Sequence, residues 1–253
     1  MRPAVTIIMP VFNSGPYLPE TLEAVIAQSH ENWTLLAIDD KSSDDSAAIV
    51  ARYAATDPRI RLLSHTDQKG AAAARNSGLE AVQTSWIAFL DADDIWTETK
   101  LATQLTWLER QGHGFGATSY GVIDRDGRRL ATRHVPPRID YTQLLRGNPI
   151  GTSTVMIHES VLNGLRFPDL RRRQDYALWL QLAQRGVVCH GLDTPLTLYR
   201  RRPDALSAAK LPSALATRHV YRTLPNLSRL GALKAYSTYL WRTGLKHLGW
   251  LDY

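Results

Sequence analysis

Three carboxylates stand together in the segment 91–94, which reads Asp-Ala-Asp-Asp and directly follows the apolar run 86–90. Two carboxylates one residue apart at a strand end can hold a hard divalent cation and leave coordination positions for phosphate oxygens and water. Such a cation would neutralise a diphosphate leaving group. The alternative is a helix N-cap, because Asp94 precedes a helical segment near Thr99. Burying three acids is costly without a cation, so the sequence favours a metal site.

A second acid of interest, Asp175, follows three consecutive arginines, Arg171–Arg173, at the start of a predicted helix. A carboxylate in such a place can accept a proton from a hydroxyl group that attacks a substrate. It can also cap the helix, and the two roles are compatible. The arginine run is either a solvated surface or a phosphate-binding cluster, and its position beside Asp175 favours phosphate.

Alternating apolar runs and helical patterns position these residues. Predicted strands cover 5–9, 33–38, 60–63 and 86–90, with predicted helices over 19–29, 47–53 and 71–81 between them. This alternation over about ninety residues predicts a parallel, doubly wound sheet. Ligands of such sheets bind at the carboxyl ends of the strands. Pro10–Asn13, Asp39–Asp40 and the 91–94 cluster should therefore meet at one edge.

The remaining pattern predicts further elements and a division of the chain. They are a helix over 100–111, a hairpin over 120–130 with Asp126-Gly127 as its turn, a loop over 147–157 that enters a strand, a helix over 175–185 and an extended segment over 189–199. From about Leu211 onward the chain is expected to be helical and basic. We therefore expect an α/β domain at 1–210 and a helical extension at 211–253.

Four motifs in a fixed order carry a resemblance to a known family. They are 5–13 (VTIIMPVFN), 39–44 (DDKSSD), Gly70 through 75–78 (RNSG), and 90–94 (LDADD). Over roughly residues 3–210 the chain resembles glycosyltransferase family 2, although Lys41 stands where that family usually has glycine. The resemblance implies a GT-A fold, which is a Rossmann-like, mostly parallel sheet flanked by helices, here with a basic helical C-terminal extension.

The resemblance also implies a nucleotide-sugar site, with a UDP-sugar as the expected donor. The expected donor-binding residues are Pro10, Phe12, Asp39, Asp40, Arg75, Asp91, Asp93 and Lys210. The first two would line the base and ribose pocket, and one of the two adjacent aspartates would accept a hydrogen bond from the base. Asp93 would ligate Mg²⁺ or Mn²⁺, with Asp91 in the metal shell or at the ribose. Lys210, and Arg200–Arg202 before it, resemble a segment that folds over the donor diphosphate.

By the same resemblance, Asp175 would be the catalytic base of an inverting transfer to a hydroxyl group. The family carries a Glu-Asp pair there, before a helix that contains tryptophan, and Gln174 replaces the glutamate. Thr152 and Ser153 resemble a loop that lines the acceptor side, where Arg173 would contact phosphate. The implied acceptor is a glycan, linked to polyprenyl pyrophosphate, in bacterial surface polysaccharide synthesis.

Charge is distributed unevenly along the chain. Residues 1–164 hold 15 basic and 19 acidic side chains, whereas residues 165–253 hold 15 and 5. A basic C-terminal third indicates an anionic partner. Leu230–Tyr253 mixes aromatic, apolar and basic residues near helical spacing, which is typical of a helix that lies on an anionic membrane surface. Packing onto the α/β domain or onto a second subunit is the alternative.

The expected location is the cytoplasm, peripheral on the inner face of the plasma membrane. No segment reaches the roughly 18 apolar residues of a membrane span. The run 5–9 is too short for a signal-peptide core, and the single cysteine, Cys189, cannot form an internal disulfide.

Two other functions fit parts of the pattern. A nucleotidyltransferase that makes nucleotide sugars would need a glycine-rich, basic loop after the first strand, and residues 12–16 do not supply one. A catalytically silent protein that binds sugar or nucleic acid would use the basic tail. The presence of both Asp93 and Asp175 argues against a catalytically silent protein. We expect no nucleic-acid partner.

Overall fold

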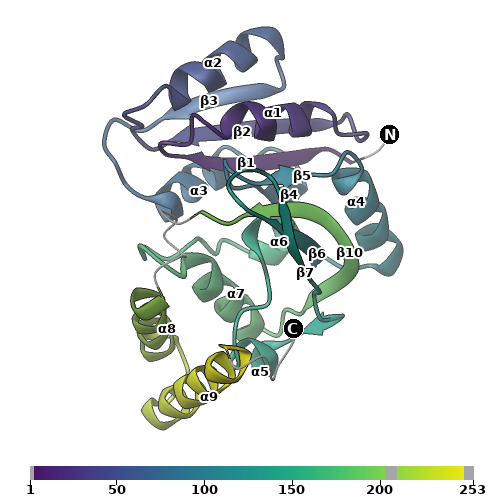
Figure 1. The fold of residues 1–253 in the computed structure, drawn as a ribbon. Helices are drawn as coiled ribbons and strands as arrows, with labels where there is room; N and C mark the ends of the chain where they lie inside the picture. Colours follow the sequence, from purple (N-terminus) through teal and green to yellow (C-terminus); the bar gives the residue numbers. More distant parts are fainter. Residues whose placement is uncertain (1–2, 203–209, 248–253) are drawn as a thin grey trace.

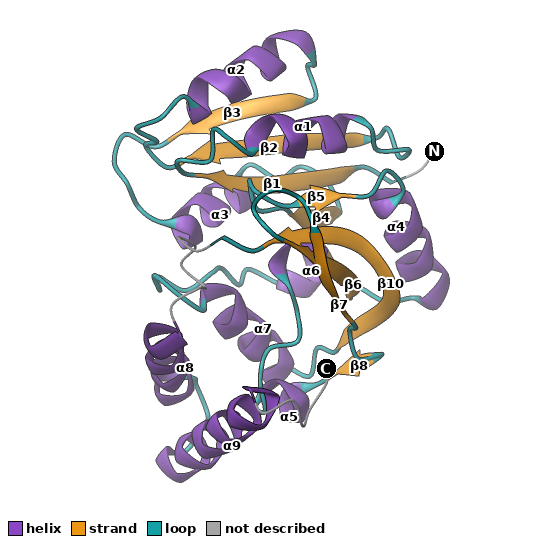
Figure 2. Ribbon diagram, viewed as in Figure 1, coloured by secondary structure: helices purple, strands orange, loops and turns teal. Residues whose placement is uncertain are grey.

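The computed structural model describes residues 3–202 and 210–247. One twisted sheet runs through this part of the protein, with helices on both of its faces (Figure 1, Figure 2). Its strands follow the order β3-β2-β1-β4-β9-β6-β10-β5, while β7 pairs with β6 and β8 pairs with β10. The predicted α/β fold class is confirmed.

The first half of the chain forms the parallel part of the sheet. Its strands are β1 (Val5–Val11), β2 (Trp33–Asp39), β3 (Ile60–Ser64) and β4 (Trp86–Phe89), and its helices are α1 (Leu18–Ile26), α2 (Ser46–Thr56) and α3 (Ala71–Glu80). Val11 of β1 lies beside Asp39 of β2 in a parallel register. The carboxyl ends of these strands therefore meet at one edge, as predicted.

The second half adds a mixed region. Its elements are β5 (Ile95–Trp96), α4 (Lys100–Gln111), β6 (Phe115–Ile123), β7 (Arg129–Arg133), β8 (Arg138–Ile139), α5 (Tyr141–Leu144), the 3₁₀ turn η1 (Thr152–Thr154), β9 (Met156–His158), α6 (Glu159–Leu162), α7 (Gln174–Gln184) and β10 (Cys189–Arg200). β9 enters antiparallel between β4 and β6. The predicted hairpin is β6–β7, with Gly127 at a φ of 84° in its turn.

Side chains of the central strand β1 divide the core in two. Ile7 and Met9 pack with α1, α2 and α4 on one face of the sheet, whereas Ile8 packs with α3 and α7 on the other. This is the alternation that a strand buried on both faces requires. Gly78 lets α3 lie close against the sheet, because a Cβ atom there would stand 2.6 Å from Cγ2 of Ile8.

The C-terminal extension consists of α8 (Lys210–Thr223) and α9 (Arg229–His247). Val220 and Tyr221 of α8, and Ala232 and Ala235 of α9, are buried in the same core as α7. Figure 1 shows the two helices beside α7, away from β1–β3. The extension therefore packs on the α/β domain, which is one of the two alternatives that the sequence left open.

The outer face of α9 is different. Leu230, Leu233 and Trp241 are 79%, 62% and 70% exposed. Their spacing of three and eight residues places them on one side of the helix, opposite Ala232 and Ala235. Among the described helices, none is long and apolar enough to cross a membrane.

Candidate active site

The three acids of the 91–94 cluster lie at the carboxyl end of β4, and they have different surroundings. Asp94 is 1% exposed, and its carboxylate accepts hydrogen bonds from Oγ of Ser153 at 2.5 Å and from the backbone N of Arg200 at 2.9 Å. Burial and the neighbouring carboxylates raise the pKa of Asp94 well above its usual range. Asp94 therefore holds the loop together, and Asp91 and Asp93 are the acids left to face a ligand.

Asp91 and Asp93 each meet one arginine. Nη2 of Arg75 donates to Oδ1 of Asp91 at 2.5 Å, and Nε of Arg202 lies 3.0 Å from Oδ2 of Asp93. Burial, followed by repulsion from Asp91, raises the pKa of Asp93 to about 6. A desolvated carboxylate that is repelled by a second, partly exposed one forms a place where a cation is favourable.

These two acids fit a magnesium or manganese ion of the kind that nucleotide sites use. In the described ranges, no group of three or more His, Cys, Asp or Glu side chains is arranged to hold a metal ion. Mg²⁺ in such sites is commonly bound by one or two carboxylates, with substrate phosphates and water completing its shell. Asp91 and Asp93 would be enough for that smaller protein share.

Arg200, at the end of β10, is a buried structural residue. Its guanidinium donates to the backbone oxygen of Asp93 at 3.0 Å, to the Arg125 oxygen at 3.0 Å and to Glu20 at 2.6 Å. Its exposure is 3%. The expectation that Arg200 folds over a donor diphosphate is therefore wrong, because its donors are already used to fix the acidic loop.

Asp39 and Asp40 end β2 and differ sharply. The carboxylate of Asp40 accepts from the backbone N of Lys69 at 2.8 Å and of Gly70 at 2.6 Å, and it pairs with Nδ1 of His65 at 2.8 Å. Asp39 is 4% exposed and accepts only from the Ser42 backbone N through Oδ2, while Oδ1 has no hydrogen-bond partner among the described residues. Asp39 is thus the aspartate with an unused buried acceptor.

Arg75 supplies unused donors at the same edge. It lies in α3, it is 4% exposed, and its Nε and Nη1 have no hydrogen-bond partner within the described part of the chain. Buried guanidinium nitrogens are normally paired, so these two nitrogens are donors that a ligand could use. The third nitrogen, Nη2, holds Asp91, and Arg75 therefore lies against the acidic cluster.

The loops after β1 and β2 are joined. Oδ1 of Asn13 accepts from the backbone N of Ser43 at 2.8 Å. Phe12 is 42% exposed at this edge, and Pro10 is half-buried. Lys41 has a φ of 61°, in the left-handed region that glycine adopts without strain. The lysine therefore keeps the turn that the family forms with glycine.

Asp175 is the second residue of α7. Its Oδ2 accepts from Oγ1 of Thr152 at 3.2 Å and from Nδ2 of Asn148 at 3.4 Å. Thr152 was expected near the acceptor and does lie beside the predicted base. Asn148 was not expected, because it stands in a loop with no motif. Gln174, which replaces the usual glutamate, is 8% exposed.

The turn η1 connects Asp175 to the acidic cluster. Thr152 bonds to Asp175, and the next residue, Ser153, bonds through Oγ both to Asp94 and to the backbone N of Asp91. Consecutive Cα atoms lie about 3.8 Å apart, so two neighbouring residues of η1 link Asp175 to the loop that carries Asp91 and Asp94. Ser153 is 3% exposed, which corrects the expectation that it faces an acceptor.

Two of the arginines before α7 have distinct surroundings. Arg173 has a φ of 64°, and its Nη2 donates to the Tyr239 hydroxyl of α9 at 3.4 Å. Nη1 of Arg172 is buried without a hydrogen-bond partner in the described residues. Lys210 begins α8, and its side chain lies outside the described part of the structure.

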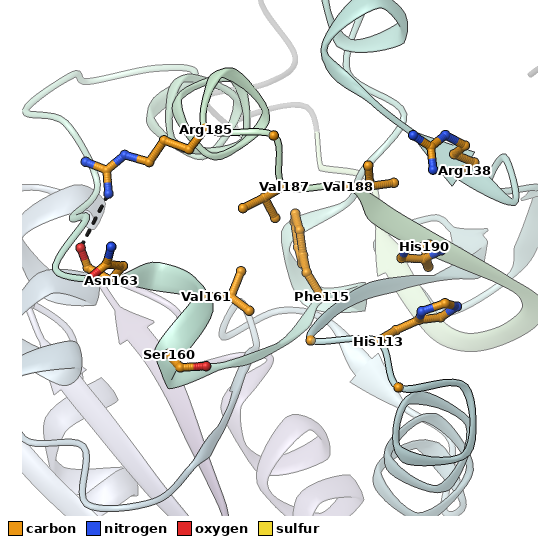
Figure 3. A pocket seen from close by; sticks show the side chains of 13 residues that line it. His113, Phe115, Arg138, Ser160, Val161, Asn163, Arg185, Val187, Val188 and His190 are labelled. Atoms are coloured by element: carbon orange, nitrogen blue, oxygen red, sulfur yellow. Dashed lines mark hydrogen bonds between the residues drawn. The ribbon is translucent and has the colours of Figure 1, made fainter.

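A cavity of about 490 Å³ lies elsewhere (Figure 3). It is lined by residues at the amino ends of β6 and β10, including the stacked rings of His113 and His190, whose centroids are 3.5 Å apart. Among the residues that the structure describes, no carboxylate lines this cavity. It therefore stands at the opposite edge of the sheet from the polar groups described above and takes no part in their chemistry.

Comparisons with known proteins agree with this geometry. The model of "Glycosyl transferase family 2" matches residues 6–164. One relative is the Bacillus subtilis protein named "Putative teichuronic acid biosynthesis glycosyltransferase TuaG". It is 34% identical over 94% of this chain and 95% of its own length. WfgD of Escherichia coli, named as a UDP-Glc:α-D-GlcNAc-diphosphoundecaprenol β-1,3-glucosyltransferase, is 36% identical over 70% of this chain and 69% of its own.

Among solved structures, the protein resembles Staphylococcus aureus TarS in complex with UDP-GlcNAc. The TM-score is 0.73 at 17% sequence identity, covering 94% of this chain and 71% of that one. This likeness confirms the GT-A fold. The sequence match extends from β1 into α6 and so includes Asp39, Arg75, Asp91 and Asp93, the residues that gather at one sheet edge. The chain thus belongs to glycosyl transferase family 2.

Proposed function

We propose that the protein is an inverting glycosyltransferase that takes a sugar from UDP and transfers it to a hydroxyl of a lipid-diphosphate-linked glycan. The observation that carries this proposal is a set of buried polar atoms that have no hydrogen-bond partner among residues 3–202 and 210–247: Oδ1 of Asp39 and two nitrogens of Arg75. A hydrogen-bond acceptor together with hydrogen-bond donors suits a ligand that carries both N–H groups and phosphates, as a nucleotide diphosphate does.

On the donor side, Oδ1 of Asp39 would accept a hydrogen bond from the uracil ring. Phe12 and Pro10, at the end of β1, would line the base and ribose. Arg75 would place its free Nε and Nη1 on the nucleotide. Asp40, whose carboxylate is engaged by His65 and by the backbone N–H groups of Lys69 and Gly70, would act indirectly by holding the loop that leads into α3.

Asp93 and Asp91 would hold Mg²⁺ or Mn²⁺ together with the diphosphate of the donor. When bound, the cation would neutralise the charge that develops on the departing UDP. The high pKa of Asp93, about 6, supports this assignment, because it reflects a desolvated acid beside another acid in a site that favours a cation.

Asp175 would act as the general base. The acceptor hydroxyl oxygen forms a bond to the anomeric carbon, and the bond from that carbon to the β-phosphate oxygen breaks on the opposite face. The hydroxyl proton passes to Asp175, UDP leaves, and the configuration at the anomeric carbon is inverted. Thr152 and Asn148 would orient the carboxylate for this transfer.

The acceptor proposal rests on the arginines and on the relatives. The unpartnered Nη1 of Arg172 and the side chain of Arg173 would meet a diphosphate on the acceptor side. WfgD is named for an acceptor in which GlcNAc is joined through diphosphate to undecaprenol. We infer a similar acceptor for this chain, within the synthesis of a bacterial surface polysaccharide.

The outer face of α9 would lie on the membrane that carries this acceptor. Leu230, Leu233 and Trp241 would enter the interface, and Lys234 on the same side would favour anionic lipid. Co-sedimentation with phosphatidylcholine vesicles, with and without phosphatidylglycerol, tests this. We expect binding that depends on the anionic lipid and is lost in Leu233→Glu. Equal binding of that variant would contradict the assignment.

A transfer assay tests the enzyme itself. The protein is incubated with UDP-glucose, UDP-GlcNAc or GDP-mannose, with a synthetic lipid that carries GlcNAc through a diphosphate, and with Mn²⁺, Mg²⁺ or EDTA. We expect UDP release and a β-linked product from an α-linked UDP-sugar. Retained configuration would refute the inverting mechanism, and pyrophosphate release from UTP and a sugar phosphate would indicate a nucleotidyltransferase instead.

Two variants separate the roles in the same assay. Asp93→Ala should abolish metal-dependent donor binding. Asp175→Asn should bind the donor nearly as the parent does, while transfer falls by about 10²-fold to 10⁴-fold, as is usual for loss of a general base. Transfer by Asp175→Asn at the parent rate would show that Asp175 is not the base.

A further inference from the structure

The C-terminal extension contacts the helix that carries Asp175 through a buried pair of tyrosines. Tyr176 directly follows Asp175 in α7, and its hydroxyl oxygen lies 2.6 Å from the hydroxyl oxygen of Tyr221 in α8. The two rings meet edge to face, with centroids 6.0 Å apart. Tyr176 is 1% exposed and Tyr221 is 0% exposed, so this contact is made away from solvent.

The same pair reaches the loop on the other side of Asp175. The Tyr176 hydroxyl donates to the backbone oxygen of Leu144. The Tyr221 hydroxyl has one proton, which it gives either to the Tyr176 oxygen or to the backbone oxygen of Leu145, 3.1 Å away. Leu145 stands three residues before Asn148, which donates to the Asp175 carboxylate. The tyrosines thus join the helix that carries the acid to the loop that orients it.

Both hydroxyls are available as donors. Burial raises the pKa of Tyr221 to about 12 and raises that of Tyr176 well above its usual range. Both groups therefore keep their protons at neutral pH. Buried hydroxyls that satisfy backbone carbonyls are held in one geometry, because leaving those partners unpaired is costly.

A second contact from the extension supports the first turn of α7. Arg173 adopts the left-handed conformation directly before the helix, with a φ of 64°. A residue other than glycine holds this conformation only where its surroundings stabilise it. Its guanidinium donates to the hydroxyl of Tyr239 in α9 at 3.4 Å, a long hydrogen bond. Figure 1 shows α8 and α9 on the α7 side of the molecule.

We propose that Tyr221 is a positioning residue for the carboxylate of Asp175, and that Tyr239 supports the same end of α7 through Arg173. The extension is therefore part of the catalytic apparatus and not only a covering of the core. This inference rests on the proposed role of Asp175 as base. A base displaced by about 1 Å can lose on the order of a hundredfold in rate, so modest loosening is measurable.

The test compares Tyr221→Phe with Thr217→Val, a matched control in the same helix. Thr217 is 0% exposed, and its hydroxyl donates to the Ser213 backbone oxygen within α8, so the control loses a buried hydrogen bond that does not reach α5 or α7. In the transfer assay with UDP-sugar and synthetic lipid acceptor, we expect Tyr221→Phe to lower kcat at least about tenfold. Its KM for the donor and its Kd for UDP should stay within about twofold of the parent values. Thr217→Val should keep the parent kcat.

Asp175→Asn is measured in parallel, so that the two proposals can fail separately. If Tyr221→Phe is folded and transfers at the parent rate while Asp175→Asn does not, the positioning inference is overturned and the base assignment stands. If Asp175→Asn transfers at the parent rate, both are overturned. If Tyr221→Phe does not fold, Tyr239→Phe decides the question: a severalfold lower kcat with unchanged donor KM supports the inference, and a parent kcat overturns it.

Discussion

Asp39 and Asp40 are neighbours of the same residue type, and they offer an internal comparison. The substitution of each by asparagine keeps the size of the side chain and removes its charge. Asp39 has one carboxylate oxygen without a partner, whereas Asp40 receives two backbone N–H groups and pairs with His65. The two substitutions should therefore affect different quantities.

Asp39→Asn should weaken nucleotide binding. A hydrogen bond from a ligand to a charged acceptor contributes about 1.5–3 kcal/mol, which corresponds to roughly a tenfold to 150-fold change in Kd. The remaining contact, from the Ser42 backbone N, can be kept by the amide oxygen. The free energy of unfolding without nucleotide should therefore change by less than about 1 kcal/mol.

Asp40→Asn should destabilise the fold. An amide offers one acceptor oxygen in place of two, so at least one of the N–H groups of Lys69 and Gly70 is left unpaired, at a cost of about 1–3 kcal/mol, with the pairing to His65 weakened in addition. A total near 3 kcal/mol would lower Tm by about 6–12 °C in a chain of this length. UDP affinity, measured below that temperature, should stay within about threefold of the parent.

The assays are isothermal calorimetry with UDP and Mn²⁺, and thermal unfolding without nucleotide. The reasoning is refuted if Asp39→Asn binds UDP with the parent Kd. It is equally refuted if Asp40→Asn has the parent Tm, because three contacts of the buried carboxylate would then contribute nothing.

Three further predictions concern stability. Lys100 is buried with no hydrogen-bond partner for Nζ in the described residues, it lies 3.9 Å from the Trp96 ring centroid, and burial lowers its pKa well below the usual 10.5. Between the folded pKa and 10.5, the unfolded chain binds a proton that the folded chain lacks, so the free energy of unfolding should rise by up to about 1.4 kcal/mol per pH unit. Urea unfolding at pH 7, 8 and 9 measures this slope, and Lys100→Met should flatten it. A parent protein whose free energy of unfolding does not rise over this range would contradict the prediction. Gly78→Ala should lower the free energy of unfolding by about 1–3 kcal/mol, because the added methyl group overpacks against Ile8. Urea unfolding measures this, and an unchanged midpoint would show that α3 can shift without cost. The free energy of unfolding should be about 1 kcal/mol higher for Lys41→Gly than for Lys41→Ala, because alanine keeps the strain of the left-handed backbone at position 41. Equal values for the two variants would show that the backbone is not strained there.

Much of this arrangement could be predicted from the sequence, since it depends on local pattern. The first four strands are apolar runs buried on both faces, and their alternation with helices specifies a parallel sheet with one functional edge. By contrast, β9 has three residues and enters antiparallel. A segment so short shows no periodicity, and only its neighbours β4 and β6 determine its direction.

The separate roles of neighbouring polar residues could not be predicted in the same way. Asp39 and Asp40 are identical as sequence, and their roles differ because only one faces the backbone of residues 69–70. Ser153 and Thr152 are adjacent and similar, yet one bonds to the acidic cluster and the other to Asp175. Such assignments depend on contacts between distant segments, for which a single sequence carries no signal.

The position of Arg200 has a consequence for how the molecule is made. Its guanidinium joins Glu20, Asp93 and Arg125, which stand 180, 107 and 75 residues earlier in the chain. Loop closure over such separations is slow, and contacts of this kind form late in folding. During synthesis, β1 to β4 can pair before β10 has left the ribosome, but the backbone oxygen of Asp93 and the carboxylate of Asp94 lack their contacts from Arg200 until it does. We therefore expect a nascent chain that is folded at one end and still without a competent metal site, so that activity arises only with the final strand.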